Sequence, residues 1–211
     1  MFTLSPDLRL VNEADQQPAA SWGRGLRFKE LKYLVHHYTA GHSYESSMQR
    51  FLDPLSKVSA HFLVGRHGGI TQMVPLDAPA WHAGADSSWQ PKGQIFADSH
   101  INFFSIGIEF DNYGPLTFIP NKGCVTWFGK SVPPDEIVEV DPDMPGAFHR
   151  RFWHCFSEEQ LEIAADLSMA LVRGLGLIGV LGHSDVCPGR KQDPGPAFPM
   201  DHVRSLVFGR D

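Results

Sequence analysis

Short apolar runs that suit buried β-strands alternate along this chain with segments of helical periodicity, and this alternation constrains the fold more than any other feature. The runs with strand character lie at 31–37, 61–65, 70–74, 105–111 and 177–181. The segments with helical character lie at 44–52, 157–173 and 200–208. This pattern predicts a single α/β domain in which helices flank a central mixed β-sheet.

The segment 157–173 gives the strongest helix prediction. Ser157 and Gln160 have the spacing of a capping box, in which two side chains satisfy backbone N–H groups at the start of a helix. Apolar residues then recur with helical spacing, and Gly174 and Gly176 predict the end of the helix. Ser43 is a plausible N-cap for the segment 44–52.

Length and charge restrict the classes of partner. A chain of 211 residues suits one domain, or one domain with an insertion, and can bury a core without disulfide or metal staples. Its net charge of −6 provides no general attraction to nucleic acid or to an anionic membrane. No apolar run approaches the ~20 residues that span a bilayer. We therefore expect no nucleic-acid partner, no membrane span and a monomer.

The cysteines and the N-terminal residues bear on the cellular compartment. Cys124, Cys155 and Cys187 are far apart and form no CxxC pair, which favours reduced thiols and excludes a disulfide framework. The first residues lack the cationic start and the apolar stretch of a secretory signal. We therefore expect a cytoplasmic protein, or one released by a route that does not read such a signal.

Two segments differ from the rest of the chain. Residues 1–28 are polar and are predicted to form an extended arm. Residues 112–153 contain six prolines, several aromatic residues and only two short β-like pieces, at 125–128 and 137–140. The aromatic residues are too many for a disordered linker. We predict an insertion that folds back onto the domain and forms one wall of its functional groove; a flap packed far from the groove is the alternative.

Histidines stand at the ends of two predicted strands. His36 and His37 are adjacent, and because side chains alternate on a strand, only one of them can face a given site. His183 follows the strand at 177–181, and a loop rich in Pro and Gly can bring it close to Asp193. Two imidazoles and one carboxylate form a known catalytic zinc set that leaves a fourth position for water. The spacing alone does not decide between His36 and His37.

Five blocks of this sequence resemble the conserved blocks of one enzyme family. The segment 37–40 (HYTA) resembles the first-ligand block of the zinc-dependent N-acetylmuramoyl-L-alanine amidases of the second type, a superfamily that includes a phage amidase lysozyme and the peptidoglycan recognition proteins. The further blocks that match in order are 58–64 (VSAHFLV), 81–84 (WHAG), 105–109 (SIGIE) and 183–196 (HSDVCPGRKQDPGP). The resemblance implies an amidase domain over 29–211, with the insertion at about 112–153.

Roles follow from the resemblance residue by residue. It implies that His37, His183 and Asp193 bind Zn²⁺, and its register favours His37 over His36. It also implies that Glu109 is the acid/base carboxylate and that Lys191 stabilises the oxyanion. Some relatives carry a tyrosine just before the hairpin histidine, where this chain has Ala60. Some relatives use cysteine as the third ligand, but Cys187 lies too early in the loop, and we interpret it as a packing residue.

The sequence constrains the substrate-binding residues less than it constrains the proposed metal ligands. Trp81 and His82 lie in a loop that we predict to form the groove wall, although packing within the loop is an equally good interpretation. His61 is a further candidate for substrate binding, against the commoner alternative of a hydrogen-bonded structural histidine.

The resemblance implies hydrolysis of the amide between N-acetylmuramic acid, or anhydro-muramic acid, and L-alanine of peptidoglycan or muropeptide fragments. A non-catalytic peptidoglycan receptor on the same fold is the competing hypothesis, and a zinc peptidase is excluded only by the resemblance. The physiological role stays open between a recycling enzyme, a phage lysin and a secreted antibacterial effector.

Overall fold

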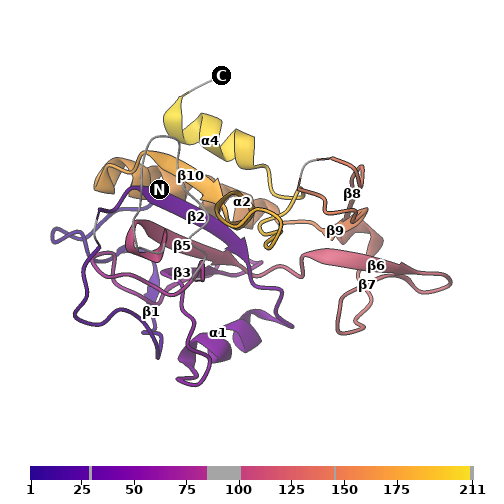
Figure 1. Ribbon diagram of the computed structural model, residues 1–211, viewed down its shortest axis with the longest axis horizontal. Coiled ribbons are helices and arrows are strands. Elements are labelled where there is room, and N and C mark those ends of the chain that lie inside the picture. Colours follow the sequence, from indigo (N-terminus) through magenta and orange to yellow (C-terminus); the bar gives the residue numbers. More distant parts are fainter. Residues whose placement is uncertain (29, 85–100, 145, 210–211) are drawn as a thin grey trace.

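A central six-stranded sheet organises the molecule (Figure 1). The computed structural model describes residues 1–28, 30–84, 101–144 and 146–209. The strand order is β1-β4-β3-β5-β2-β10, and only the β3–β4 pair is antiparallel. The strands are β1 (Asp15–Gln16), β2 (Tyr33–Tyr38), β3 (Phe62–Val64), β4 (Ile70–Gln72), β5 (Ser105–Phe110) and β10 (Gly179–Gly182). The predicted mixed sheet flanked by helices is confirmed.

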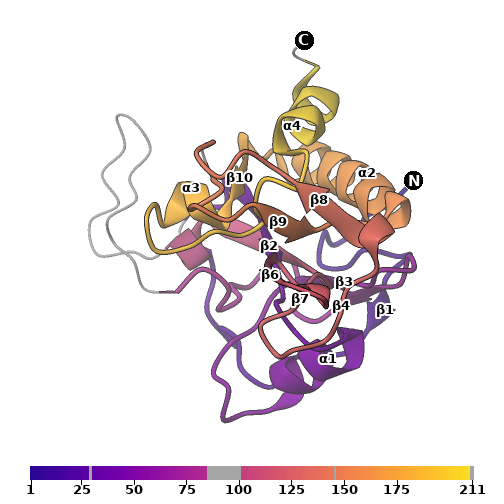
Figure 2. The ribbon, with the colours of Figure 1, turned by 90° about the vertical axis from the view of Figure 1, so that its right-hand side faces the viewer.

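Helices cover both faces of this sheet (Figures 1 and 2). On one face, α2 and α4 bury apolar side chains such as Leu167 and Val203 against Leu34 of β2. On the other face, Phe51 of α1 packs against Leu63 of β3. The helices are α1 (Tyr44–Leu52), α2 (Glu158–Leu175), α3 (His183–Val186) and α4 (Met200–Phe208), and short 3₁₀ turns span Ile101–Phe103 and Pro134–Glu136.

The sequence identified the starts of α1 and α2 correctly. Ser157 accepts a hydrogen bond from the backbone N–H of Gln160, and the Gln160 side chain bonds back to the Ser157 N–H, so the predicted capping box is present. Ser43 caps α1 in the same way, with Ser46 as its partner. Gly176, in the left-handed region at φ +67°, ends α2. Each of the two serine N-caps contributes about 1 kcal/mol to the stability of its helix.

The segment 112–153 contributes to a second sheet, where the sequence suggested two short β-like pieces. The piece at 137–140 coincides with a strand and the piece at 125–128 overlaps one only at Val125, while two further strands were not expected. The four antiparallel strands of this sheet are ordered β7-β6-β9-β8, and the sheet projects from the end of the main sheet (Figure 1). The strands are β6 (Pro115–Ile119), β7 (Gly123–Val125), β8 (Ile137–Glu139) and β9 (Phe152–His154). Strands of three to five residues are too short to show an alternating pattern.

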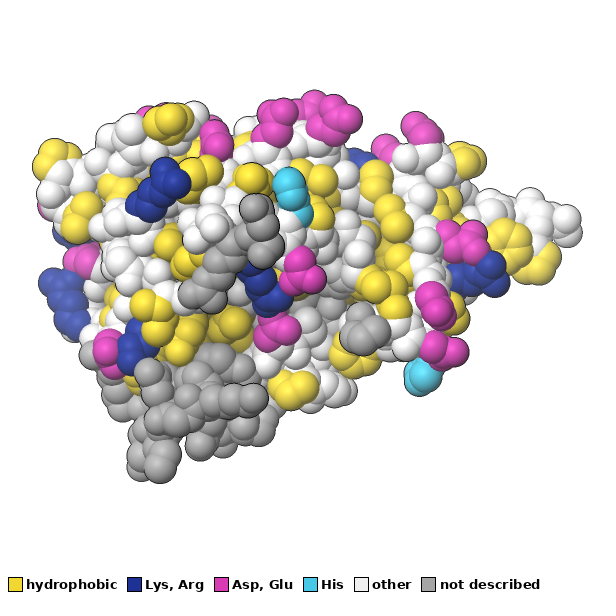
Figure 3. All heavy atoms as spheres, turned by 90° about the horizontal axis from the view of Figure 1, so that it is seen from above, with side chains coloured by type: hydrophobic (Ala, Val, Ile, Leu, Met, Phe, Trp, Pro, Cys, Tyr) yellow, Lys and Arg dark blue, Asp and Glu magenta, His cyan; other side chains and the backbone are white. Residues whose placement is uncertain are grey.

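The N-terminal residues pack along the sheet. β1 adds a strand beside β4, and Val11, Ala14 and Ala19 are buried. Among the described residues, no helix is long and apolar enough to cross a membrane. On the face shown in Figure 3, the visible basic side chains are scattered among acidic ones and form no broad positive surface.

The second sheet packs against the loop that follows Asp193. Trp153 of β9 is 1% exposed, and a Cβ added to Gly195 would lie 2.5 Å from Cζ3 of its indole. Gly195 also has φ +77°, where a side chain is strained. Glycine is required here for two independent reasons, and the contact couples the second sheet to the loop that positions Asp193.

We therefore expect Gly195→Ala to lower the free energy of unfolding by about 2–5 kcal/mol, as the sum of left-handed strain and overpacking. Gly189→Ala is the matched control, because Gly189 has φ +78° in the same loop but no atom within 4 Å of its added Cβ. It should lose only about 1–2 kcal/mol. Urea unfolding measures both, and equal losses would show that the Trp153 contact does not constrain the loop.

Candidate metal centre

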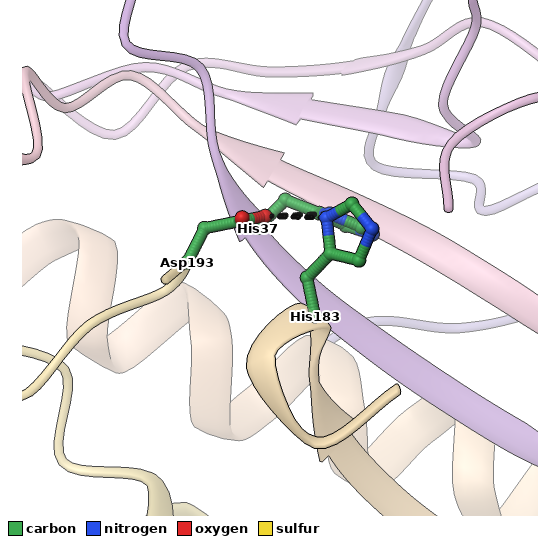
Figure 4. Close-up of side chains that lie close together, drawn as sticks. All are labelled: His37, His183 and Asp193. Atoms are coloured by element: carbon green, nitrogen blue, oxygen red, sulfur yellow. Dashed lines mark hydrogen bonds and ion pairs between the residues drawn. The ribbon is translucent and has the colours of Figure 1, made fainter. Parts of the chain in front are cut away.

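Three side chains from distant parts of the sequence meet at one end of the main sheet (Figure 4). β2 and β10 are parallel neighbours, and Gly182 pairs with His36, so the carboxyl ends of the two strands lie together. His37 is near the end of β2, and His183 directly follows β10. The loop after α3 returns Asp193 to the same place, where the Ser184 N–H donates to the Asp193 backbone oxygen at 2.9 Å.

The donor atoms of these side chains are close to one another. His37 Nδ1 and His183 Nδ1 are 2.9 Å apart, and they lie 2.9 Å and 2.8 Å from the same oxygen, Oδ2 of Asp193. All three side chains are buried. Bonds of about 2.0 Å to a tetrahedral zinc ion would place such ligands about 3.3 Å apart. The two nitrogens and the oxygen lie somewhat closer together than that, in a triangle that approximates one face of the tetrahedron.

The outer nitrogen of His183 shows which way its ring faces. His183 Nε2 lies 3.2 Å from the backbone oxygen of Ala83, which can only accept a hydrogen bond. Nε2 therefore carries the proton of the neutral ring, and Nδ1 presents its lone pair to the centre.

A chain of hydrogen bonds assigns His37 in the same way. The Ser105 hydroxyl donates to the Ile101 carbonyl at 2.9 Å, so its oxygen accepts from His82 Nε2 at 3.2 Å. His82 Nδ1 then has only a lone pair, and it accepts from His37 Nε2 at 2.9 Å. Burial, followed by the charge of His37, lowers the pKa of His82 well below its ordinary value, which keeps this ring neutral. His37 Nδ1 thus presents a lone pair to the centre.

Three lone pairs consequently face one another in a buried space. Burial, followed by the charge of His183, lowers the pKa of His37 to about 4. This ring therefore stays neutral near neutral pH, and no added proton separates the three lone pairs. Buried lone pairs without a donor are unfavourable unless a cation lies between them. The donor set therefore fits a divalent metal ion.

His36 lies on the opposite face of β2. Its Nε2 is 3.0 Å from Ser168 Oγ of α2, and its ring contacts Phe110 and Phe198. The structure thus places His37, and not its neighbour, with His183 and Asp193. Cys187 is fully buried in an apolar cluster with Val35 and is not part of the group.

A pocket of about 790 Å³ opens onto the three side chains. Glu109 lines it, and because Glu109 pairs with His37 across β5 and β2, the two side chains share a face of the sheet at the same level. Burial, and secondarily the charge of Asp193, raise the pKa of Glu109 to about 8. Its buried Oε2 has no hydrogen-bond partner among the described residues. A carboxyl group in this state can both accept and return a proton near neutral pH.

The other candidates divide between the pocket and the core. Lys191, Trp81 and His82 line the pocket. The Trp81 backbone N–H donates to Ser59 Oγ at 2.9 Å, and its ring packs edge-on against Phe103 at 5.9 Å. His82 is 9% exposed, and the hydrogen bonds above occupy both of its ring nitrogens.

His61 is not among the residues that line this pocket. Its Nδ1 accepts from the backbone N–H of Gly107 at 3.0 Å, and its Nε2 donates to the Ala78 carbonyl at 3.0 Å. Both ring nitrogens of this fully buried side chain are therefore used by the core. Burial lowers the pKa of His61 to about 4.

Three residues that support the centre were not identified from the sequence. Ser105 fixes the proton of His82, the Ala83 carbonyl orients His183, and Gly107 leaves room for the His82 ring. A Cβ on Gly107 would lie 2.4 Å from His82 Cγ. A serine at the start of an apolar strand and a glycine within it were the available signals, but neither indicates its partner.

The second sheet also reaches the pocket. Tyr113, Pro115 and Trp127 belong to the segment 112–153 and line the pocket together with Glu109. This segment thus contributes to one wall of the pocket.

The sequence is similar to those of known proteins. The N-acetylmuramoyl-L-alanine amidase family matches residues 27–196. The 1,6-anhydro-N-acetylmuramyl-L-alanine amidase AmpD of Escherichia coli (strain K12) is 31% identical over 151 residues, which cover 72% of this chain and 59% of AmpD. The N-acetylmuramoyl-L-alanine amidase AmiD of the same organism is 29% identical over 191 residues, which cover 86% and 55%. The chain thus spans less than two thirds of the length of these curated relatives.

Solved structures have the same fold. The crystal structure of an AmpD derivative superposes with a TM-score of 0.58 at 24% identity and covers 94% of this chain and 96% of its own. The complex of Escherichia coli AmiD with the substrate anhydro-N-acetylmuramic acid-L-Ala-D-gamma-Glu-L-Lys gives a TM-score of 0.56 at 24% identity, covering 97% of this chain and 65% of its own.

Removal of the His82 hydrogen bond should weaken metal binding. We expect His82→Leu to lower zinc affinity by roughly 10–100-fold, because His37 loses the acceptor that turns its Nδ1 toward the centre. His82→Asn is the matched variant, since its amide oxygen lies near the position of Nδ1 and can still accept; it should retain most of the affinity. Competition with a fluorescent chelator measures both, and a Leu variant with wild-type affinity would refute this role.

The His61 environment predicts an acid-sensitive fold. Its pKa rises from about 4 in the folded protein to 6.5 when unfolded, so the unfolded state binds more protons and stability falls as the pH drops below 6.5. Between pH 7 and pH 5 this one residue should account for about 2 kcal/mol. Urea unfolding of His61→Asn should show a correspondingly shallower decline. His149→Asn, at a side chain that is 89% exposed, should keep the full decline; equal slopes for the two variants would contradict the assignment.

Proposed function

Because the chain belongs to the N-acetylmuramoyl-L-alanine amidase family, we propose that it hydrolyses the amide bond between the lactyl group of N-acetylmuramic acid, or of its anhydro form, and L-alanine. One observation carries the proposal: three metal-binding donors converge in a pocket that also contains a carboxyl group with a raised pKa. An unstrained amide requires an activated water and a proton donor for the leaving amine, and this set of groups can provide both.

His37 Nδ1, His183 Nδ1 and Asp193 Oδ2 would hold the metal ion, and the N₂O donor set with a tetrahedral arrangement favours Zn²⁺. When bound, zinc lowers the pKa of a water molecule and polarises a carbonyl group. Three protein ligands leave one position for that chemistry, as catalytic zinc sites do.

Glu109 is the proposed general base and acid. It lies on the pocket side of β5, level with His37, and its buried carboxyl group has an oxygen that no described residue occupies. Glu109 takes the proton of the attacking water and transfers it to the nitrogen of L-alanine as the amide bond breaks.

Lys191 is the proposed oxyanion partner. It lines the pocket two residues before Asp193, so the same rigid loop positions the ammonium group and the carboxylate ligand. Its positive charge stabilises the oxygen that becomes negative when water adds to the carbonyl carbon, a contribution of typically about 3 kcal/mol for a donor of this kind.

The competing hypothesis is a receptor that binds peptidoglycan without cleaving it. A receptor needs the pocket, but it does not need a complete donor triad or a carboxyl group with a raised pKa beside it. The presence of all these groups favours the enzyme.

The substrate class is a muropeptide or a peptidoglycan fragment. AmpD is named for the 1,6-anhydro form, and AmiD was crystallised with an anhydro-muramoyl tripeptide, so soluble anhydro-muropeptides are the first substrates to test. Intact sacculi and purified anhydro-muropeptides should be offered side by side and the products followed by mass. Release of intact stem peptides that begin with L-alanine supports the proposal; cleavage within the peptide would refute it.

Replacement of the reactive groups should separate metal binding from turnover. We expect Glu109→Gln to retain zinc but lose turnover by roughly 10²–10⁴-fold, because an amide cannot accept the proton of water. Lys191→Ala should also retain zinc and lose turnover by roughly 10²–10³-fold. His37→Ala, His183→Ala and Asp193→Ala should lose zinc itself, whereas His36→Ala should keep it. Metal content and initial rates measure these outcomes, and near-normal turnover in either of the first two variants would remove that residue from the mechanism.

A further inference from the structure

Trp127 is a large apolar side chain that is exposed inside the pocket. It follows β7 in the second sheet, its side chain is 66% exposed, and it lines the same pocket as Glu109 and Asp193. An indole left open to water in a ligand pocket is available for contact with a ligand.

The ring is held in a fixed orientation. Its Nε1–H donates to the Ala40 carbonyl at 2.9 Å. The rings of Phe128, at 5.3 Å, and His42, at 5.4 Å, pack against it at interplanar angles of 84° and 56°. Because one hydrogen bond and two ring contacts fix the indole before a ligand arrives, little conformational entropy is lost on binding.

Trp127 is also close to the candidate metal centre. Its hydrogen-bond partner Ala40 is three residues beyond His37, and three residues span at most about 11 Å. A group bound on the indole and a bond held at the candidate metal centre therefore occupy the same pocket.

The chemistry of the pocket distinguishes the two halves of a muropeptide. Since the indole N–H is already used, Trp127 offers a ligand only its ring face, which suits the C–H face of a neutral pyranose better than it suits a carboxylate. The cations that line the pocket, Arg50, Arg190 and Lys191, come instead from α1 and from the loop that carries Asp193. Those positive charges match the anionic stem peptide.

We infer that Trp127 is a stacking platform for a pyranose ring in the glycan part of the substrate, so that the second sheet selects for the sugar. This inference rests on the proposed function, because it assigns one half of the proposed substrate. Trp127→Ala should raise the KM for an anhydro-muramoyl tripeptide by roughly tenfold, as loss of a stacking contact does, and change kcat less than about twofold. Trp127→Phe should recover most of the difference.

Phe118→Ala is the matched control. Phe118 is an aromatic residue of the same sheet with 56% exposure, and it does not line the pocket. Its replacement should leave KM unchanged.

A binding experiment without turnover separates this inference from the proposed function. Saturation-transfer NMR can follow peptide-free N-acetylmuramic acid and the sugar-free tripeptide L-Ala-D-γ-Glu-L-Lys on the zinc-loaded protein. The inference predicts that Trp127→Ala loses the sugar signal and keeps the tripeptide signal, whether or not the wild-type protein hydrolyses the joined molecule. An unchanged sugar signal, or loss of the tripeptide signal alone, would overturn it.

Discussion

The site depends on the hydrogen bonds made by the outer nitrogens of two buried imidazoles. His82 accepts from His37 and the Ala83 carbonyl accepts from His183, so one short loop turns both Nδ1 lone pairs toward Asp193. Without those acceptors each ring could adopt the other tautomer, and the three donor atoms would no longer face a common point. The segment 81–84 thus orients the two histidines of the candidate metal centre.

The fold serves this arrangement through contacts that are distant in sequence. The parallel pairing of β2 with β10 brings the two histidines together, and the pairing of β2 with β5 sets Glu109 beside them. The loop of Asp193 is anchored by Gly195 against Trp153, which belongs to the second sheet. The second sheet therefore does two things: it packs behind the loop that positions Asp193, and it presents Trp127 to the pocket.

Much of the fold and of the candidate site could be predicted from residues that are close together in the sequence. The capping box at Ser157 and the strand-end histidines depend on near neighbours, and the conspicuous loop up to Asp193 carries its own motif. The second sheet was only partly predictable: a β-like piece was expected where β8 lies, but the pairing of its very short strands depends on contacts among them and with the core. The function of His82 was also hidden, because it depends on space above Gly107 and on the direction of the Ser105 hydroxyl. Both are contacts between distant residues, and they form only when the chain folds.

The most direct test of the central claim is zinc K-edge X-ray absorption on the zinc-loaded protein. We predict a first shell of two imidazole nitrogens and oxygen donors at about 2.0–2.1 Å, from His37, His183, Asp193 and one water, with no sulfur. In Asp193→Ala the zinc should be lost. A sulfur atom at about 2.3 Å, which Cys187 would supply, or a shell with a single imidazole, would contradict the account.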